Sequence, residues 1–264
     1  MKKLVSLGYC ILFGFAIIAA PALAAPANSP QITMSSAINK AGRQRMLSQR
    51  IVKFYCQIGQ EILADKSRQQ LQQSVALFES QLAELKQAAP NPDVQGAVAK
   101  METLWGPFKE IVSKAPSKED GKKLIGMSEE LLQAAHKTTT LLQDATGTPA
   151  GRLVNMAGRQ RMLSQRMAKF YMLKRWGFNV SQVSDGLEQA RNEFKGALQE
   201  LLAAPQNTTA IKKELELAKM QWIFFENALA QDGVQDPTFA VNVATSSERI
   251  LEVMDRVTGM YEKF

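Results

Sequence analysis

Arginine and glutamine side chains recur at identical spacing in two separate parts of the chain. The stretch AGRQRMLSQR begins at Ala41 and again at Ala157, and KFY follows both copies. Each copy carries three arginines, whose planar guanidinium groups present forks of donors that suit planar or tetrahedral oxyanions. A lone buried arginine is costly, and a bound anion would offset that cost. This stretch therefore favours the recognition of a small anion.

The spacing decides which arginine faces inward if the stretch is helical. Arg43 and Arg50 then share a face, whereas Arg45 points about 200° away from Arg43. Arg45 continues a stripe whose other members are Ile38, Ala41, Ser48 and Val52. We therefore expect Arg45, and Arg161 in the second copy, to be the inward arginines. If the two helices face each other, these two side chains would close on one anion from two sides.

Glycine and serine also interrupt the apolar pattern of the repeated stretch. Gly42 and Gly158 stand within the helix, where glycine costs ~1 kcal/mol relative to alanine, and they would allow backbone or ligand to approach closely. Violations of local rules mark candidate functional sites. Two other interpretations remain open: solvated arginines with a glycine that permits helix packing, and a recent local duplication. The secondary candidate residues are Arg43, Ser48, Arg50, Arg159, Ser164 and Arg166.

The similarity extends beyond this stretch. A shift of 116 residues aligns both motifs and also FESQLAEL at Phe78 with FKGALQEL at Phe194. Slightly larger shifts align WGPF with WIFF and SEELL with SERIL. The drift indicates small loop insertions between matched elements. The sequence therefore predicts two copies of one domain, at residues 30–146 and 147–264.

Strong helix formers dominate both copies, and no alternating β-branched run occurs in the sequence. Helix starts are indicated at Asn91–Pro92, Ser117 and Asp236–Pro237. We predict an all-α fold of two tandem antiparallel four-helix bundles after a signal peptide. The expected helices are 32–64, 67–89, 92–113, 118–146, 150–176, 180–203, 208–230 and 238–263.

The N-terminus is typical of a secretory signal peptide. Lys2 and Lys3 precede an apolar run that ends near Ala20, and Ala22–Ala24 offers an A-x-A cleavage site, so we expect residues 1–24 to be removed. An uncleaved membrane anchor is the alternative. No second apolar run approaches the ~18 residues of a membrane span. We therefore expect a periplasmic protein that does not bind nucleic acid, despite its formal net charge of +7.

Catalytic residue patterns are missing from the sequence. His136 is the single histidine, and it aligns with Asp255 in the second copy, which suggests a residue on a polar face. Cys56 is the one cysteine outside the signal peptide, and we expect it to be a buried free thiol. There is no metal-ligand cluster, phosphate-binding loop or Ser/His/acid set. The sequence predicts neither enzymatic activity nor a metal or cofactor.

The repeated helix resembles a known family. INKAGRQRMLSQRIVKFY and VNMAGRQRMLSQRMAKFY are similar to the signature helix of the N-terminal domain of type IV pilus methyl-accepting chemotaxis transducers (PilJ-like). They also resemble the periplasmic P-box of NarX-type nitrate sensors, although RQRMLSQR is closer to the pilus form. The resemblance implies a periplasmic four-helix bundle. In the nitrate sensors two bundles dimerise, and one arginine from each P-box holds nitrate. The resemblance implies that the corresponding arginines here are Arg45 and Arg161, and that the motif glycines are Gly42 and Gly158.

These observations support two functional hypotheses. The first is a periplasmic sensory-type protein that binds a small oxyanion, such as nitrate or nitrite, between the two P-box-like helices. The family's receptors carry a second transmembrane helix and cytoplasmic signalling modules, and neither is read in this sequence, so we expect no signalling output of its own. The alternative is a non-catalytic interaction protein that associates with a chemoreceptor, a sensor kinase or a type IV pilus system. The residue inventory disfavours a hydrolase or a metal protein.

Overall fold

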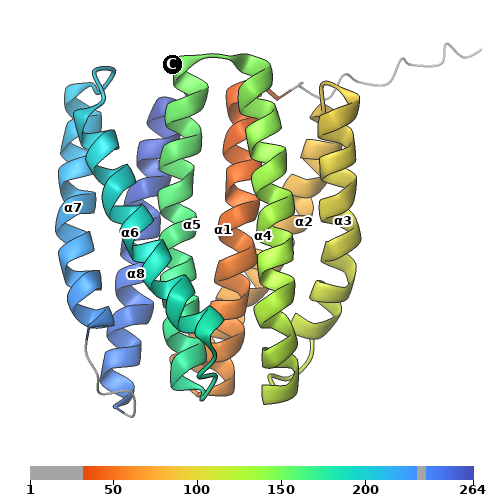
Figure 1. Ribbon diagram of the computed structural model, residues 1–264, viewed down its shortest axis with the longest axis vertical. Helices are drawn as coiled ribbons and strands as arrows, with labels where there is room; N and C mark the ends of the chain where they lie inside the picture. Colours follow the sequence, from red (N-terminus) through yellow and green to blue (C-terminus); the bar gives the residue numbers. More distant parts are fainter. Residues whose placement is uncertain (1–31, 231–235) are drawn as a thin grey trace, which may run out of the picture. The chain divides into compact units, whose positions relative to one another are not determined.

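Helix-forming residues and capped ends produce an all-α architecture. The computed structural model describes residues 32–230 and 236–264, so the expected signal peptide, 1–24, lies outside the described residues. Within the described ranges the chain forms eight α-helices and no strand (Figure 1). The helices are α1 (Met34–Gly59), α2 (Ala64–Ala88), α3 (Pro92–Val112), α4 (Lys118–Thr146), α5 (Pro149–Arg175), α6 (Ser181–Ala203), α7 (Thr209–Leu229) and α8 (Pro237–Tyr261).

The expected capping residues stand at the helix starts. The side chains of Asn91 and Ser117 each accept a hydrogen bond from the backbone N–H three residues on, at 3.0 and 3.1 Å. Asp236 accepts one from the N–H of Thr238 at 2.8 Å. Each bond satisfies an N–H that has no partner within its own helix. Local sequence therefore places these three starts correctly.

The prediction that the first helix runs to residue 64 was wrong, because α1 ends at Gly59. Glu61 and Leu63 adopt the left-handed region, with φ of 58° and 49°, and such residues cannot continue a right-handed helix. The end is also enforced from outside α1. A Cβ at Gly59 would lie 2.4 Å from the Trp176 ring, and the Gln60 amide donates to the backbone oxygen of Met172 at 3.0 Å.

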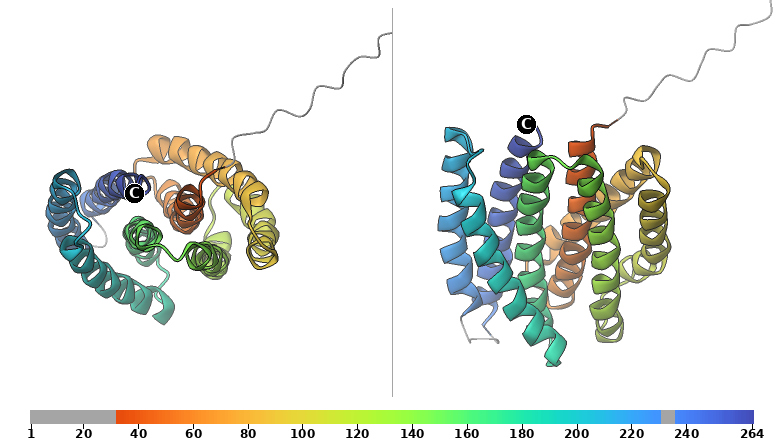
Figure 2. Two further views of the ribbon diagram at one scale, coloured as in Figure 1. Left: turned by 90° about the horizontal axis from the view of Figure 1, so that it is seen from above. Right: turned by 45° about the horizontal axis from the view of Figure 1, so that its top comes forward.

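The two motif helices, α1 and α5, pack against each other at the centre of the helical unit Ile32–Phe264 (Figure 2). They run parallel, since Arg45 contacts Asn155 near their N-terminal ends and Gln60 contacts Met172 near their C-terminal ends. Around this pair, α2 and α4 pack on α1, while α6 and α8 pack on α5. Helices α3 and α7 lie outermost, on α4 and α8. The fold is a tandem helical bundle.

Equivalent aromatic pairs support the internal alignment. Trp105 stacks on Phe78 with ring centroids 3.9 Å apart, and Trp222 stacks on Phe194 at 4.5 Å. All four side chains are buried, as is the free thiol of Cys56. Helix α4 ends at Thr146 and α5 begins at Pro149, on either side of the division between copies predicted at 146–147, which stays a prediction.

None of the helices α1–α8 combines the length and the apolar character needed to cross a membrane. The apolar side chains instead meet in a buried core that both copies share.

Two glycines on α6 allow a matched test of this packing. A Cβ added at Gly186 would lie 2.6 Å from the buried Phe170 ring, whereas one added at Gly196 would meet nothing within 4 Å. We expect Gly186→Ala to lower the free energy of unfolding by about 1–3 kcal/mol through overpacking. Gly196→Ala should raise it by roughly 0.5–1 kcal/mol through helix propensity. Urea denaturation of both variants checks this, and equal effects would contradict the packing of α6 on α5.

Candidate functional site

The four residues predicted to form the central site do come together. Arg45 on α1 and Arg161 on α5 are both buried, at 1% and 0% exposure. A Cβ at Gly42 would lie 3.2 Å from Nη2 of Arg45 and 3.7 Å from Nη2 of Arg161. At Gly158 the corresponding distances are 3.2 Å to Arg161 and 3.6 Å to Arg45. The glycines therefore leave the space into which the two guanidinium groups fit.

Each arginine reaches across to the other copy. Nη2 of Arg45 donates to the backbone oxygen of Asn155 at 3.2 Å. Nη2 of Arg161 donates to the backbone and side-chain oxygens of Asn39, at 3.3 and 2.7 Å. The two asparagines occupy equivalent positions in the repeat. Among the described residues, Nε of each arginine is buried without a hydrogen-bond partner, so neither guanidinium is fully satisfied.

The surroundings of the two arginines differ in charge. Nη1 of Arg161 donates to the carboxylate of Asp255, which also accepts from Nη2 of Arg43 at 2.8 Å. The equivalent position in the first copy holds His136, whose Nδ1 lies 3.3 Å from Nη1 of Arg45. A guanidinium only donates, so Nδ1 is the acceptor and Nε2 carries the proton of the neutral ring. Within the described residues, no carboxylate lies within ion-pair distance of Arg45.

These environments shift the titration of the buried groups. Burial, together with the charges of Arg159 and Arg161, lowers the pKa of Arg45 to about 9. Burial lowers the pKa of Arg161 to about 10, and Asp255 opposes that change. Burial and the nearby Arg45 also lower the pKa of His136, so its ring is neutral at pH 7. Arg45 is therefore a buried cation that no contacting carboxylate neutralises.

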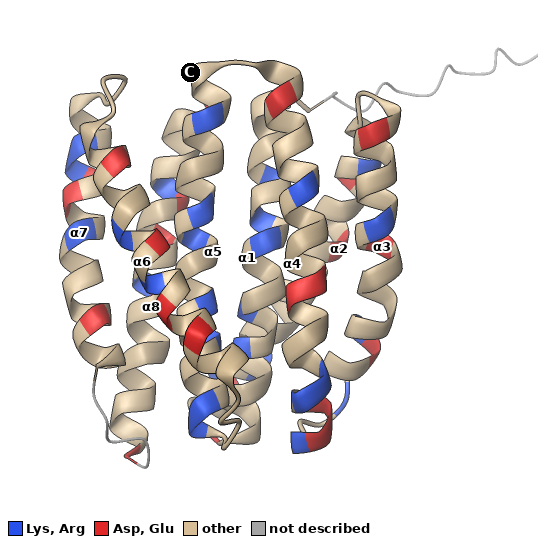
Figure 3. Ribbon diagram, viewed as in Figure 1, with Lys and Arg blue, Asp and Glu red and all other residues tan. Residues whose placement is uncertain are grey.

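A cavity of about 140 Å³ opens beside Arg45, between α1, α4, α5 and α6. Three arginines line it, against one glutamate, Glu193, whose carboxylate pairs with Arg159 at 2.7 Å. The excess of positive charge agrees with the gathering of Lys and Arg along α1 and α5 in Figure 3. Its lining residues are Arg45, Leu132, Gln133, His136, Arg159, Met162, Arg166, Gln189 and Glu193.

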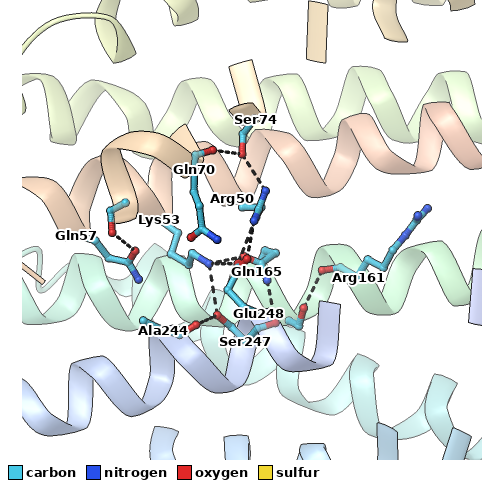
Figure 4. A network of polar contacts seen from close by, with 12 residues as sticks. Arg50, Lys53, Gln57, Gln70, Ser74, Arg161, Gln165, Ala244, Ser247 and Glu248 are labelled. Carbon is cyan, nitrogen blue, oxygen red and sulfur yellow. Dashed lines mark hydrogen bonds and ion pairs between the residues drawn. The ribbon is translucent and has the colours of Figure 1, made fainter. Parts of the chain in front are cut away.

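The secondary candidate Arg50 belongs to a different arrangement (Figure 4). Arg50 Nη2 and the fully buried Lys53 Nζ both contact the Glu248 carboxylate at 2.5 Å. Lys53 Nζ also donates to Oε1 of Gln165 at 2.7 Å. The ion pairs thus run from α1 of the first copy to α8 of the second, and they connect two copies that are far apart in the sequence.

Equivalent ion pairs run in the other direction, from α5 of the second copy to α4 of the first. Arg166 and Lys169 on α5 both contact Glu129 on α4 at 2.7 Å. Lys169, like Lys53, is 0% exposed. Sequence reasoning assigned no role to either lysine, although the recurrence of KFY after each motif was a signal. The recurrence of SEELL as SERIL was the corresponding signal for the carboxylates that pair with these lysines, Glu129 and Glu248.

The two serine candidates do not line the cavity, and their hydroxyls bond within their own helices. Ser48 and Ser164 are buried, and each donates to the backbone oxygen three residues earlier, at 2.8 Å.

Sequence reasoning also missed His136 and Asp255 as partners of the inward arginines. Their alignment with each other at one position of the repeat was the available signal. No group of three or more potential metal ligands occurs among the described residues.

The buried ion pairs make a prediction for acid stability. Burial alone would raise the pKa of Glu248, but Lys53 and Arg50 hold it at about 2. Because the folded pKa lies below the unfolded value, this contribution is present above pH ~4.5 and is lost as the pH falls toward about 2. Glu248→Gln should lower the free energy of unfolding at pH 7 by about 3–5 kcal/mol, since it leaves buried Lys53 unpaired.

Urea denaturation between pH 7 and pH 3 measures this effect. The matched control is Glu252→Gln, the same change at an exposed position of α8, which should leave the midpoint nearly unchanged. An acid dependence as steep in Glu248→Gln as in the unmodified protein would contradict the assignment.

Comparison with known families agrees with the duplication. The family described as type IV pili methyl-accepting chemotaxis transducer N-term (PilJ) matches residues 28–130 and again residues 145–243. No curated protein and no solved structure matches the chain. The two matches together cover more than half of the 264 residues, and each includes one motif helix with its inward arginine. The chain therefore belongs to the family of type IV pili methyl-accepting chemotaxis transducer N-terminal domains.

Proposed function

We propose that the protein is a non-catalytic, periplasmic sensory-type module that binds a small oxyanion at the pair of motif helices. The observation that carries this proposal is Arg45. Its side chain is 1% exposed, and no carboxylate contacts it among the described residues. A buried cation without a counter-charge costs several kcal/mol, and a bound anion would offset this cost.

The size and shape of the available space favour a small ligand. The cavity beside Arg45 measures about 140 Å³, whereas sites for drug-sized molecules occupy roughly 300–1,000 Å³. A water molecule takes up about 30 Å³ in the liquid, so the cavity suits one small oxyanion with a few waters. Arg45 and Arg159 both line this cavity, and their planar guanidinium groups can donate hydrogen bonds to a planar oxyanion.

Nitrate and nitrite are the first ligands to test. They are planar, and the motif's resemblance to the P-box of NarX-type sensors implies one arginine from each of two facing helices. Arg45 and Arg161 stand in that relation, on parallel helices that face each other. The expected signal peptide would deliver the protein to the periplasm, and a membrane receptor or pilus component would then be its partner.

A second candidate function is a non-catalytic interaction protein of a chemoreceptor, sensor kinase or pilus system. One observation favours it. Met220, Ile223 and Phe224 on α7 are 51, 53 and 60% exposed. Large apolar side chains gathered on one helix face are typical of a surface that contacts another protein. A protein could have both functions, and only the first requires that an oxyanion stabilise the fold.

We expect one planar oxyanion in a panel of nitrate, nitrite, sulfate, phosphate and chloride to raise the midpoint of thermal unfolding. At a hundred times its Kd, the anion should add ~2.7 kcal/mol to the free energy of unfolding. Arg45→Met should keep the fold, because an apolar side chain replaces an uncompensated buried cation, and it should abolish the shift. Differential scanning calorimetry at fixed ionic strength measures both.

The matched control is Arg152→Met, the same change at an exposed position of α5 that pairs with Glu200 on the surface. This variant should respond to the anion as the unmodified protein does. A flat panel for the unmodified protein would refute oxyanion binding and favour the interaction protein. An undiminished response of Arg45→Met would refute the role of Arg45.

A further inference from the structure

Each copy of the repeat holds one inward arginine. Of these two arginines, only Arg161 is in contact with a carboxylate of a described residue. At Arg161, the Asp255 carboxylate accepts from Arg161 on α5 and from Arg43 on α1, the latter at 2.8 Å. A carboxylate that bridges two guanidinium groups uses the same donors that a free oxyanion would use. Asp255 is thus an internal anion in the second position.

At Arg45 the same donors are present without that carboxylate. Arg45 and Arg159 are the equivalents of Arg161 and Arg43, and both line the cavity of about 140 Å³. His136 replaces Asp255, and its Nδ1 accepts from Arg45 at 3.3 Å. At the second position the Asp255 carboxylate itself contacts both arginines, Arg161 and Arg43.

A second exchange accompanies the first. Glu193 on α6 pairs with Arg159 at 2.7 Å, and the equivalent residue in the first copy is Leu77. An acidic residue is therefore present on α6 of the second copy and absent from the equivalent position of α2 in the first. It neutralises Arg159 and makes no ion pair with Arg45. Of the two inward arginines, Arg45 alone lacks a contacting carboxylate within the described residues.

We propose that the protein binds one oxyanion per chain, in the cavity beside His136, at the place that the Asp255 carboxylate occupies in the other copy. This inference rests on the proposed function and adds the location and the stoichiometry. The anion contacts Arg45 on α1 and Arg159 on α5 next to His136 on α4. It links these three helices as Asp255 links α1, α5 and α8.

Exchange of the two residues tests the proposal. His136→Asp supplies the missing carboxylate, so it should raise the midpoint of thermal unfolding without anion and weaken anion binding at least tenfold. The double exchange His136→Asp with Asp255→His should restore binding, because the empty position moves to the second copy. Gly126→Asp adds the same charge at an exposed position of α4, where a new side chain meets nothing within 4 Å, and it should bind normally.

Isothermal titration with nitrate, nitrite, sulfate and phosphate, each at fixed ionic strength, measures affinity and stoichiometry. One anion per chain, lost in His136→Asp and retained in Gly126→Asp, would establish the site. Two anions per chain, or unchanged affinity in His136→Asp, would overturn the location while leaving oxyanion binding intact. No response from the unmodified protein to any of the four anions would overturn the proposed function and this inference with it.

Discussion

The burial of two arginine side chains between two packed helices is the constraint on which the rest of this structure depends. Arg45 and Arg161 lie between α1 and α5, where both side chains are buried and their like charges repel each other. Gly42 and Gly158 lie against the two guanidinium groups, and a Cβ at either glycine would come within 3.2 Å of an arginine nitrogen. Backbone oxygens of Asn39 and Asn155 accept part of their hydrogen bonds. The repeated sequence is thus the sequence of an interface.

Buried ion pairs make this interface reciprocal. Lys53 on α1 depends on Glu248 of the second copy, and Lys169 on α5 depends on Glu129 of the first. The lysine of each copy contacts polar side chains of the other copy, and an isolated copy would lose these contacts. Each copy therefore supplies the counter-charges that the other requires. The physical consequence is a fused pair of domains whose central helices hold one another, as two subunits of a dimer would.

The two copies differ in charge at two equivalent positions near the inward arginines. Asp255 gives the inward Arg161 a carboxylate, whereas His136 stands at the equivalent position beside Arg45. Glu193, at the position equivalent to Leu77, pairs with Arg159. The scaffold keeps both arginines in equivalent positions, and they differ in whether a carboxylate contacts them among the described residues. In a sensory-type domain, an anion at such a place would act directly on the packing of three helices. Ligand binding and the association of the two copies would then be linked.

Much of the fold follows from local pattern and internal comparison. Helix formers, capping residues and the repeat predict eight helices in two copies, and helical geometry alone singles out Arg45 and Arg161 as the inward arginines. These features are readable because they depend on residues within a few turns of each other. The match of both copies to one family agrees with the same pattern.

Tertiary structure decided the rest, because the decisive partners are distant in the chain. Gly59, the last residue of α1, packs so closely on Trp176 that a Cβ there would lie 2.4 Å from the ring, and no local propensity predicts this contact. Lys53 and Glu248 are 195 residues apart, and Arg45 and His136 are 91 apart. Helical periodicity shows which way a side chain points but not which residue from another helix it meets. The sequence by itself determined the helices, the repeat and the inward arginines, whereas only the packing of α1 on α5 decided which arginine has a counter-charge and which lies beside a cavity.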